Sequence, residues 1–216
     1  MSLFTLLITL FFIFSTYAES NHCGKQCQYT IEGTTLKITG SGKMQDFYGD
    51  KAIPWKDTRE TITEIQITGV TSIGKRAFQN MIKLTSITFD SVISIGEGAF
   101  YNTGLTQITI PASVEKIERN AFEENTQLTK ILFTEESKLT TIDERAFKNC
   151  EKLESIDFPD SVVTMGKKLF EGCLGLKSVS IGSKLENLGD SLFIKCYSLS
   201  QITINENNKH MQQLIM

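Results

Sequence analysis

The sequence predicts an α/β repeat solenoid, a right-handed superhelix of stacked coils with a parallel β-sheet face, short helical turns and an N-terminal β-hairpin cap. Three observations predict it. A phenylalanine recurs at steps of 22, 22, 25, 23 and 23 residues, and an aliphatic residue always stands eight positions before it. A strand-like segment of constant length then closes each unit. Constant segments joined by variable linkers indicate stacked coils, because coils must align where they touch and can bulge where they meet water.

The apolar positions of each unit predict one continuous interior. The recurring aromatic residues are Phe78, Phe100, Phe122, Phe147, Phe170 and Phe193. Each closing strand carries two aliphatic residues two positions apart, which point inward because side chains alternate along a strand. We expect the six rings to stack from coil to coil. We also expect a helical turn around the Ala-Phe pair of each unit, as at Ala77-Phe78.

The full frame of the unit, L-x-x-I-x-[IF]-P-x-x-V-x-x-I-x-x-x-A-F-x-x-C, resembles the BspA-like class of leucine-rich repeats. These repeats occur in surface and secreted proteins of bacteria and protists. The resemblance covers about Cys23 to Ile204 and rests on six copies of the frame. It implies a leucine-rich-repeat solenoid and, usually, adhesion or recognition at a cell surface. It does not name a ligand.

The chain divides into four parts. Residues 1–18 read as a secretory signal peptide, because an uncharged apolar run is followed by small residues and ends at Ala18. No Lys or Arg precedes that run, so an uncleaved anchor is the alternative. Residues 19–61 form the N-terminal cap, and residues 62–204 hold one partial and six full repeats. Residues 205–216 form a tail, which either caps the last coil or marks a chain that lacks further repeats.

The cap is predicted to be a β-hairpin. Tyr29 to Ile31 and Leu36 to Ile38 alternate in polarity and are separated by a Gly-containing turn. Such a hairpin would cover the open apolar edge of the first coil. Trp55 follows in the link to the repeats, and we assign it to the core of the cap rather than to a ligand platform.

Composition argues against several classes of function. The formal net charge is -3, and no basic run is longer than Lys167-Lys168, which argues against nucleic-acid binding. No phosphate-binding glycine loop occurs, and no cofactor is expected. Beyond the signal peptide, no segment resembles a transmembrane span.

Five cysteines raise the question of redox or metal chemistry. Cys150, Cys173 and Cys196 each follow their phenylalanine by three residues. A metal site or redox relay is one interpretation, but we favour a ladder of small buried side chains, because zinc needs four ligands and this column offers three. Cys23 and Cys27 in the cap either pair with each other or stay reduced.

We find no catalytic constellation. His22 and His210 are the only histidines and stand near opposite ends of an elongated array. A Ser/His/Asp or Cys/His arrangement would therefore need distant ends to meet. Pairs of acidic residues fall in turns and joints, where solvated surface charge is the simplest interpretation. We expect no enzyme activity and no metal site.

A ligand is expected on the outward side of the successive strands, where two parallel columns of side chains should form. Most members are short, uncharged and able to hydrogen-bond, which suits a protein surface or a glycan. Leu132 is an exposed apolar exception and a candidate hot spot. The alternative is that Ser and Thr only satisfy strand propensity on a solvated face. The candidate ligand-binding residues are Ser86, Thr88, Gln107, Thr109, Lys130, Leu132, Ser155, Asp157, Ser178 and Ser180.

The sequence therefore predicts a non-enzymatic protein, secreted or at the cell surface, that binds a protein or glycan partner on a cell or in the extracellular matrix. This function follows from the resemblance, whereas the periodicity predicts only the scaffold. A second hypothesis is a structural component that associates with itself through its C-terminal edge.

Overall fold

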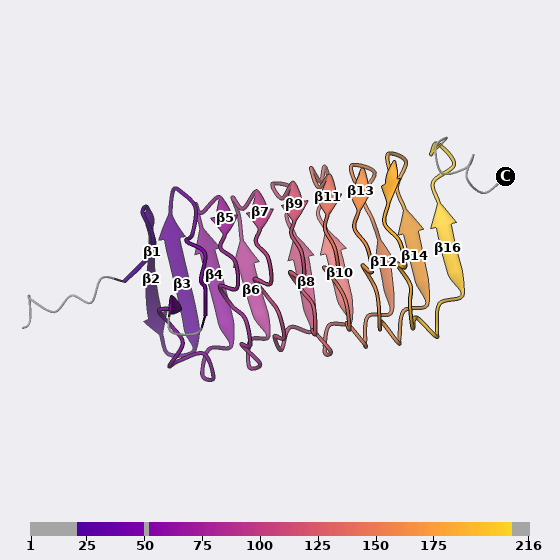
Figure 1. Cartoon of the computed structure of the whole chain (residues 1–216). Helices are drawn as coiled ribbons and strands as arrows, with labels where there is room; N and C mark the ends of the chain where they lie inside the picture. Colours follow the sequence, from indigo (N-terminus) through magenta and orange to yellow (C-terminus); the bar gives the residue numbers. More distant parts are fainter. Residues whose placement is uncertain (1–20, 50–51, 209–216) are drawn as a thin grey trace, which may run out of the picture.

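The structure is a computed structural model and describes residues 21–49 and 52–208. The chain winds into an elongated solenoid in which each coil before the last described strand, β16, contributes one long and one short strand (Figure 1). The long strands of the repeats are β4 (Glu64–Thr68), β6 (Ser86–Phe89), β8 (Gln107–Ile110), β10 (Lys130–Phe133), β12 (Ser155–Asp157), β14 (Ser178–Ile181) and β16 (Gln201–Ile204). The short strands are β5 (Ser72–Ile73), β7 (Ser94–Ile95), β9 (Lys116–Ile117), β11 (Thr141–Ile142), β13 (Thr164–Met165) and β15 (Asn187–Leu188).

Parallel pairing joins each strand to its counterpart in the next coil. The short strands form one continuous sheet in the order β15-β13-β11-β9-β7-β5. The long strands form two sheets, because no ladder joins β6 to β8. This break follows the coil in which Leu105 stands five residues after its phenylalanine instead of six. The missing residue lies in the loop that leads to β8, while the short-strand sheet stays continuous through the same coil, where β7 pairs with both β5 and β9.

The predicted hairpin closes the N-terminal end. Strand β2 (Cys27–Glu32) pairs antiparallel with β3 (Thr35–Gly40), and the short β1 (His22–Gly24) pairs with β2. Strand β3 then pairs parallel with β4, so the hairpin continues the sheet of long strands. Leu36 and Ile38 of β3 are fully buried against the first coil, as a cap requires.

The interior is a single column of aromatic rings surrounded by aliphatic side chains. Successive phenylalanine rings lie 5.2–5.8 Å apart between centroids, from Phe78 to Phe193. Trp55 continues this phenylalanine stack into the cap, 5.6 Å from Phe78, and its indole N–H donates to the Ala77 carbonyl at 2.9 Å. The ring of Trp55 is buried, so it packs in the core of the cap.

The prediction of an α/β fold with short helical turns is wrong. The described residues contain sixteen strands and no α-helix. Around each phenylalanine, the residues two before and two after have left-handed backbone angles, as at Arg76 (φ 57°) and Asn80 (φ 62°). A helix needs a continuous run of right-handed residues, so the alternation prevents it.

Alternation of backbone conformation instead directs hydrogen bonds between coils. The N–H groups of Arg76, Phe78 and Asn80 all donate to carbonyl groups of the next coil, at 2.8–2.9 Å. The intervening N–H groups, such as that of Gln79, close local turns to the residue three before. The same pattern recurs in the following coils, so each turn forms a third hydrogen-bonded ladder along the solenoid.

Candidate functional site

The outward side chains of the long strands form two columns in register. Gln107 pairs with Lys130, Lys130 with Ser155, and Ser155 with Ser178, each as direct neighbours on adjacent strands. In the second column, Thr109 pairs with Leu132, and Asp157 pairs with Ser180. We call this surface of β6 to β16 the strand face.

Eight of the ten predicted ligand-binding residues are exposed, and Ser178 and Ser180 are half-buried. The structure does not unite all ten in one sheet. Ser86 and Thr88 of β6 belong to the sheet that contains the hairpin, while the other eight belong to the sheet of β8 to β16. Leu132 is 39% exposed at the middle of the strand face.

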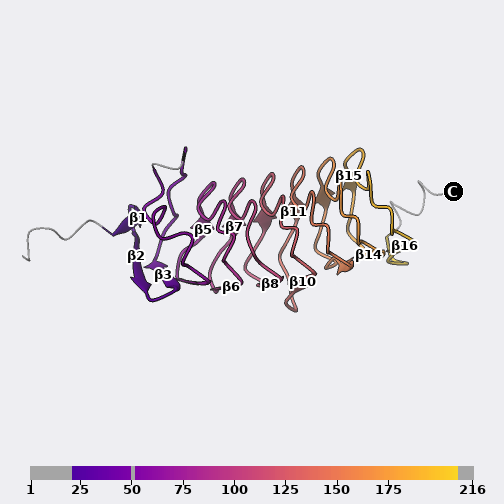
Figure 2. The same ribbon diagram turned by 90° about the horizontal axis from the view of Figure 1, so that it is seen from below.

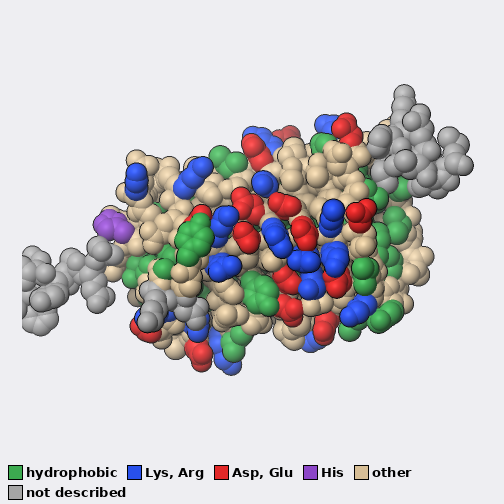
Figure 3. Space-filling model, in the orientation of Figure 1, with side chains coloured by type: hydrophobic (Ala, Val, Ile, Leu, Met, Phe, Trp, Pro, Cys, Tyr) green, Lys and Arg blue, Asp and Glu red, His purple; other side chains and the backbone are tan. Residues whose placement is uncertain are grey.

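The turns make a surface of a different character. Figure 2 shows the turns and the long strands on opposite sides of the coils. Ion pairs connect neighbouring turns, including Lys75 with Glu97 at 3.4 Å and Lys148 with Glu123 at 3.1 Å. Figure 3 shows Lys and Arg side chains intermixed with Asp and Glu along the middle of one face. The surface of the turns therefore carries many charged side chains of both signs. On the strand face, by contrast, Lys130 and Asp157 are the charged side chains among the ten predicted residues.

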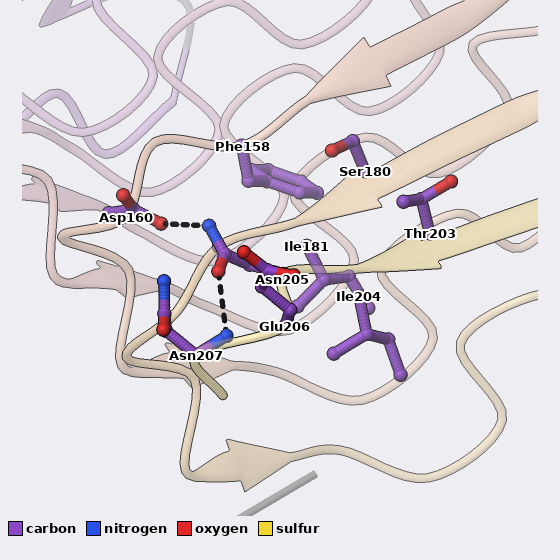
Figure 4. A pocket seen from close by; sticks show the side chains of 10 residues that line it. Phe158, Asp160, Ser180, Ile181, Thr203, Ile204, Asn205, Glu206 and Asn207 are labelled. Carbon is purple, nitrogen blue, oxygen red and sulfur yellow. Dashed lines mark hydrogen bonds between the residues drawn. The ribbon is translucent and has the colours of Figure 1, made fainter. Parts of the chain in front are cut away.

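A pocket of about 430 Å³ opens at the carboxyl ends of β12, β14 and β16. Figure 4 shows Ser180 and Thr203 at one end of this terminal pocket and Asp160 and Asn207 at the other. Apolar side chains lie between these polar groups. The lining residues are Phe158, Asp160, Ser180, Ile181, Gly182, Thr203, Ile204, Asn205, Glu206 and Asn207.

Hydrogen bonds hold the polar end of the terminal pocket in place. One carboxylate oxygen of Asp160, Oδ1, accepts from the backbone N–H of Ser183 at 2.7 Å and from Nδ2 of Asn205 at 3.3 Å. The carbonyl oxygen of the Asn205 side chain accepts from the backbone N–H of Asn207 at 2.9 Å (Figure 4). Within the part of the chain that the structure describes, no group donates to Oδ2 of Asp160.

Sequence reasoning missed this pocket, because it assigned residues 205–216 to a tail and did not single out Asp160. A signal was present. Asp160, Ser183 and Glu206 follow one another at steps of 23 residues, which is the spacing of the last repeats. That spacing places the three residues at the same point of successive coils, so the joints after β12, β14 and β16 had to lie side by side.

The three repeat cysteines have a structural role in the interior. Each thiol donates to the carbonyl of the phenylalanine one coil earlier: Cys150 to Phe122 at 3.3 Å and Cys173 to Phe147 at 3.1 Å. Asn125 takes the same place in its coil and donates to the Phe100 carbonyl at 2.7 Å. Burial raises the pKa of all three thiols, that of Cys196 to about 11, so the reactive thiolate form is disfavoured.

Cys23 and Cys27 are joined by a disulfide bond in the cap, with 5.1 Å between their Cα atoms. Both are fully buried. Among residues 21–49 and 52–208, no group of three or more His, Cys, Asp or Glu side chains could hold a metal ion. Over the same residues, no helix has the length and apolar character needed to cross a membrane.

Comparison with solved structures shows the fold shared with bacterial proteins. The pneumococcal vaccine antigen PcpA matches with a TM-score of 0.52 at 19% identity, over 85% of this chain and 70% of that one. The leucine-rich repeat protein of T. pallidum matches with a TM-score of 0.50 at 20% identity, over 83% and 69%. A leucine-rich cell surface protein of Faecalibacterium prausnitzii matches with a TM-score of 0.46 at 21% identity, over 86% and 54%.

No curated protein matches the sequence. The model of the BspA-type leucine-rich repeat region matches residues 57–138 and 133–215, with six copies of the repeat. These two matches span most of the chain and coincide with the stacked coils seen in the structure. The chain therefore belongs to the BspA-type leucine-rich repeat family.

Proposed function

We propose that this protein is secreted or displayed at the cell surface, and that its strand face binds a protein or glycan partner on a cell or in the extracellular matrix. The protein acts by recognition and catalyses no reaction. The observation that carries the proposal is the strand face itself, with its exposed columns of short hydrogen-bonding side chains around Leu132. An exposed apolar side chain among polar neighbours offers a partner an apolar contact surrounded by hydrogen-bonding groups.

The location outside the cell rests on the predicted signal peptide and is supported by the cap. Residues 1–18 lie outside the described residues, so their role remains a prediction from sequence. The disulfide between Cys23 and Cys27 is of the kind found in oxidising, extracellular surroundings. From the repeat pattern of the sequence, we also propose the limits of the cap at 19–61, of the repeats at 62–204 and of the tail at 205–216.

The proposal is tested by binding of the purified secreted chain to cells, to matrix proteins and to a glycan panel. Once a ligand is found, Leu132→Arg is compared with Ile93→Arg, because Ile93 is 43% exposed but lies just before the short strand β7. We expect Leu132→Arg to lower affinity at least tenfold and Ile93→Arg to leave it unchanged. Equal binding by both folded variants and the wild type would refute the role of the strand face.

Self-association through the C-terminal edge is a second candidate, supported by its exposed interior positions. Ile202 and Leu188 are 47% and 42% exposed, whereas their counterparts one coil earlier, Val179 and Met165, are 2% exposed. In the sheets of the described residues, β15 and β16 are the last strands. Edge strands with unpaired backbone groups are templates for pairing with another chain.

Light scattering over a range of protein concentrations tests this candidate. Self-association predicts a mass that rises with concentration, and Ile202→Lys should suppress the rise. Ile82→Lys is the matched control, since Ile82 is also exposed but lies away from the edge. A monomeric mass at all concentrations would reject self-association and leave the recognition proposal standing.

A further inference from the structure

We propose that the terminal pocket is the subsite for one uncharged sugar ring of a glycan ligand. This inference rests on the proposed function and names the chemical class that this part of the surface would bind. The pocket volume of about 430 Å³ falls in the range of about 300–1,000 Å³ that is usual for small-molecule sites. It is therefore large enough for a sugar ring.

The lining has the mixed chemistry that a sugar ring needs. A sugar presents an apolar C–H face and a rim of hydroxyl groups. Ile204 is half-buried and supplies an apolar surface, Phe158 and Ile181 are buried beneath it, and Asp160, Asn207 and Ser180 supply polar groups around it (Figure 4). The side chains come from three neighbouring coils, and parallel strands lie about 4.8 Å apart, which is close to the width of one ring.

Asp160 is the residue best placed to bind hydroxyl groups. Its Oδ1 is fixed by Ser183 and Asn205, so the carboxylate is oriented before a ligand arrives. Its Oδ2 has no donor among the described residues and can accept from a sugar hydroxyl. The hydroxyl of Ser180, which lines the pocket, can both donate and accept. Hydrogen-bond acceptors that are already held in place reduce the entropy lost when a ligand binds.

The charges around the pocket select against acidic sugars. Asp160 is a carboxylate, and no Lys or Arg belongs to the described lining. A sialic or sulfated sugar would bring a negative charge close to Asp160 with no cation in that lining to balance it. A neutral ring has no such penalty. A lysine side chain of a partner protein would be attracted, but it would leave most of the hydroxyl-binding groups without partners.

The same pocket is continuous with the strand face. Ser180 and Thr203 line the pocket and also face outward from β14 and β16. Ser180 pairs with Asp157, which belongs to the predicted binding columns. A glycan with one ring in the pocket could therefore continue along the strand face toward Leu132, which explains how one short pocket would serve a longer ligand.

The test is binding of the full secreted chain to neutral, acidic and amine-bearing glycans in a buffer containing EDTA. We expect binding of neutral glycans to fall at least fivefold in Asp160→Asn and in Ser180→Ala. The change at Asp160 keeps an oxygen that can accept from Ser183, so the fold should survive. Asp190→Asn is the matched control, because Asp190 lies in the last turn, outside the pocket, and is paired with Lys167 at 3.7 Å. It should bind as the wild type does.

Each other outcome overturns the inference in a distinct way. No binding of neutral glycans, or binding of acidic glycans alone, contradicts the assigned ligand class. Binding that EDTA abolishes would mean that the carboxylates hold a cation instead of contacting the sugar. If Leu132→Arg abolishes binding of an identified ligand while Asp160→Asn does not, the pocket assignment fails and the proposed function stands. If no ligand of any class depends on Leu132 or Asp160, both fail.

Discussion

The two ends of the solenoid differ in how deeply they bury the same apolar position of the repeat. At the N-terminal end, β3 pairs with β4, and Ile65 of β4 is completely buried. At the C-terminal end, β16 is the last strand of its sheet in the described chain, and Ile202, which occupies the same frame position as Ile65, is 47% exposed. Identical residues at identical positions thus differ in burial because one has a neighbour on each side and the other does not.

This difference indicates where stability and function are placed. Coils of a solenoid are stabilised by their neighbours, so interior coils gain from two interfaces and terminal coils from one. The closed end is reinforced by the buried Trp55 and by the Cys23–Cys27 disulfide. The terminal pocket lies at the other end, where the final joints are free to present polar side chains outward. The reinforcing contacts of the cap thus lie at one end and the terminal pocket at the other.

The largest expected effect comes from removing a ring at the middle of the solenoid. Phe122 is fully buried between Phe100 and Phe147, with centroid distances of 5.2 and 5.7 Å. Phe122→Ala should lower the free energy of unfolding by about 3–5 kcal/mol, since it removes apolar contacts and leaves a cavity between coils. Urea denaturation followed by circular dichroism measures the change. A melting temperature within a degree or two of the wild type would contradict the shared interior.

A matched pair of substitutions tests the comparison between the ends. Ile65→Ala should cost about 2–5 kcal/mol, as is usual for a buried isoleucine, while Ile202→Ala should cost less than about 1 kcal/mol. The same denaturation measurement compares the two variants. If both cost the same, the last coil of the described chain is covered as well as the first, and the C-terminal edge is not open.

The disulfide of the cap should have an intermediate effect. Cys23 and Cys27 are four residues apart. Closing so short a loop lowers the entropy of the unfolded chain and thereby raises the free energy of unfolding by about 2 kcal/mol. The double change Cys23→Ser and Cys27→Ser should therefore lower stability by about that amount and act on the cap first. Proteolysis that still begins at the C-terminal coils in this variant would show that the cap does not depend on the bond.

The smallest effect concerns the buried thiols. At pH 8, Cys150 and Cys173 should resist alkylation in the folded protein, Cys196 should react slowly, and all three should react in denaturant. The unfolded thiol titrates near pH ~8.5, but burial raises the pKa of Cys196 to about 11. Because the unfolded state loses this proton first, stability should fall as the pH rises from about 8.5 toward 11. Mass spectrometry after alkylation measures the reactivity, and rapid labelling of folded Cys173 would contradict its burial.

Periodicity was sufficient to predict the stacked coils, because every unit repeats the same buried positions. The six phenylalanines follow from apolar residues at fixed spacing. The hairpin follows from alternating polarity around a Gly-containing turn, and the burial of Trp55 from the usual placement of large apolar side chains. The same spacing did not reveal that the turns around the phenylalanines are not helical. Their short Ala-Phe segments are compatible with a helix, but Asn80, Gly98, Asn102 and Asn120 stand at the left-handed positions, and Asn and Gly are the residues that best accept that conformation.

The strand face was predictable and the terminal pocket was not, for a physical reason. Alternation along a strand determines which side chains point outward, so Thr109 and Leu132 could be assigned from sequence. The pocket depends on how the joints after three strands fold over one another, and joints vary in length and composition. Hydrogen bonds of Asp160 to Ser183 and Asn205, and of the Asn208 amide to the Gly182 carbonyl, bring those joints together.

The central claim is that all coils share one interior, which the cap covers at the N-terminal end and which is exposed at the last coil of the described chain. Native-state hydrogen exchange of the turn amides tests it most directly, because each of these N–H groups donates to the next coil, Phe78 to Ala99 and Phe170 to Leu192. We predict protection that decreases from Phe78 toward Phe170, with the last coils opening first. Protection at Phe170 equal to or greater than that at Phe78 would contradict the account.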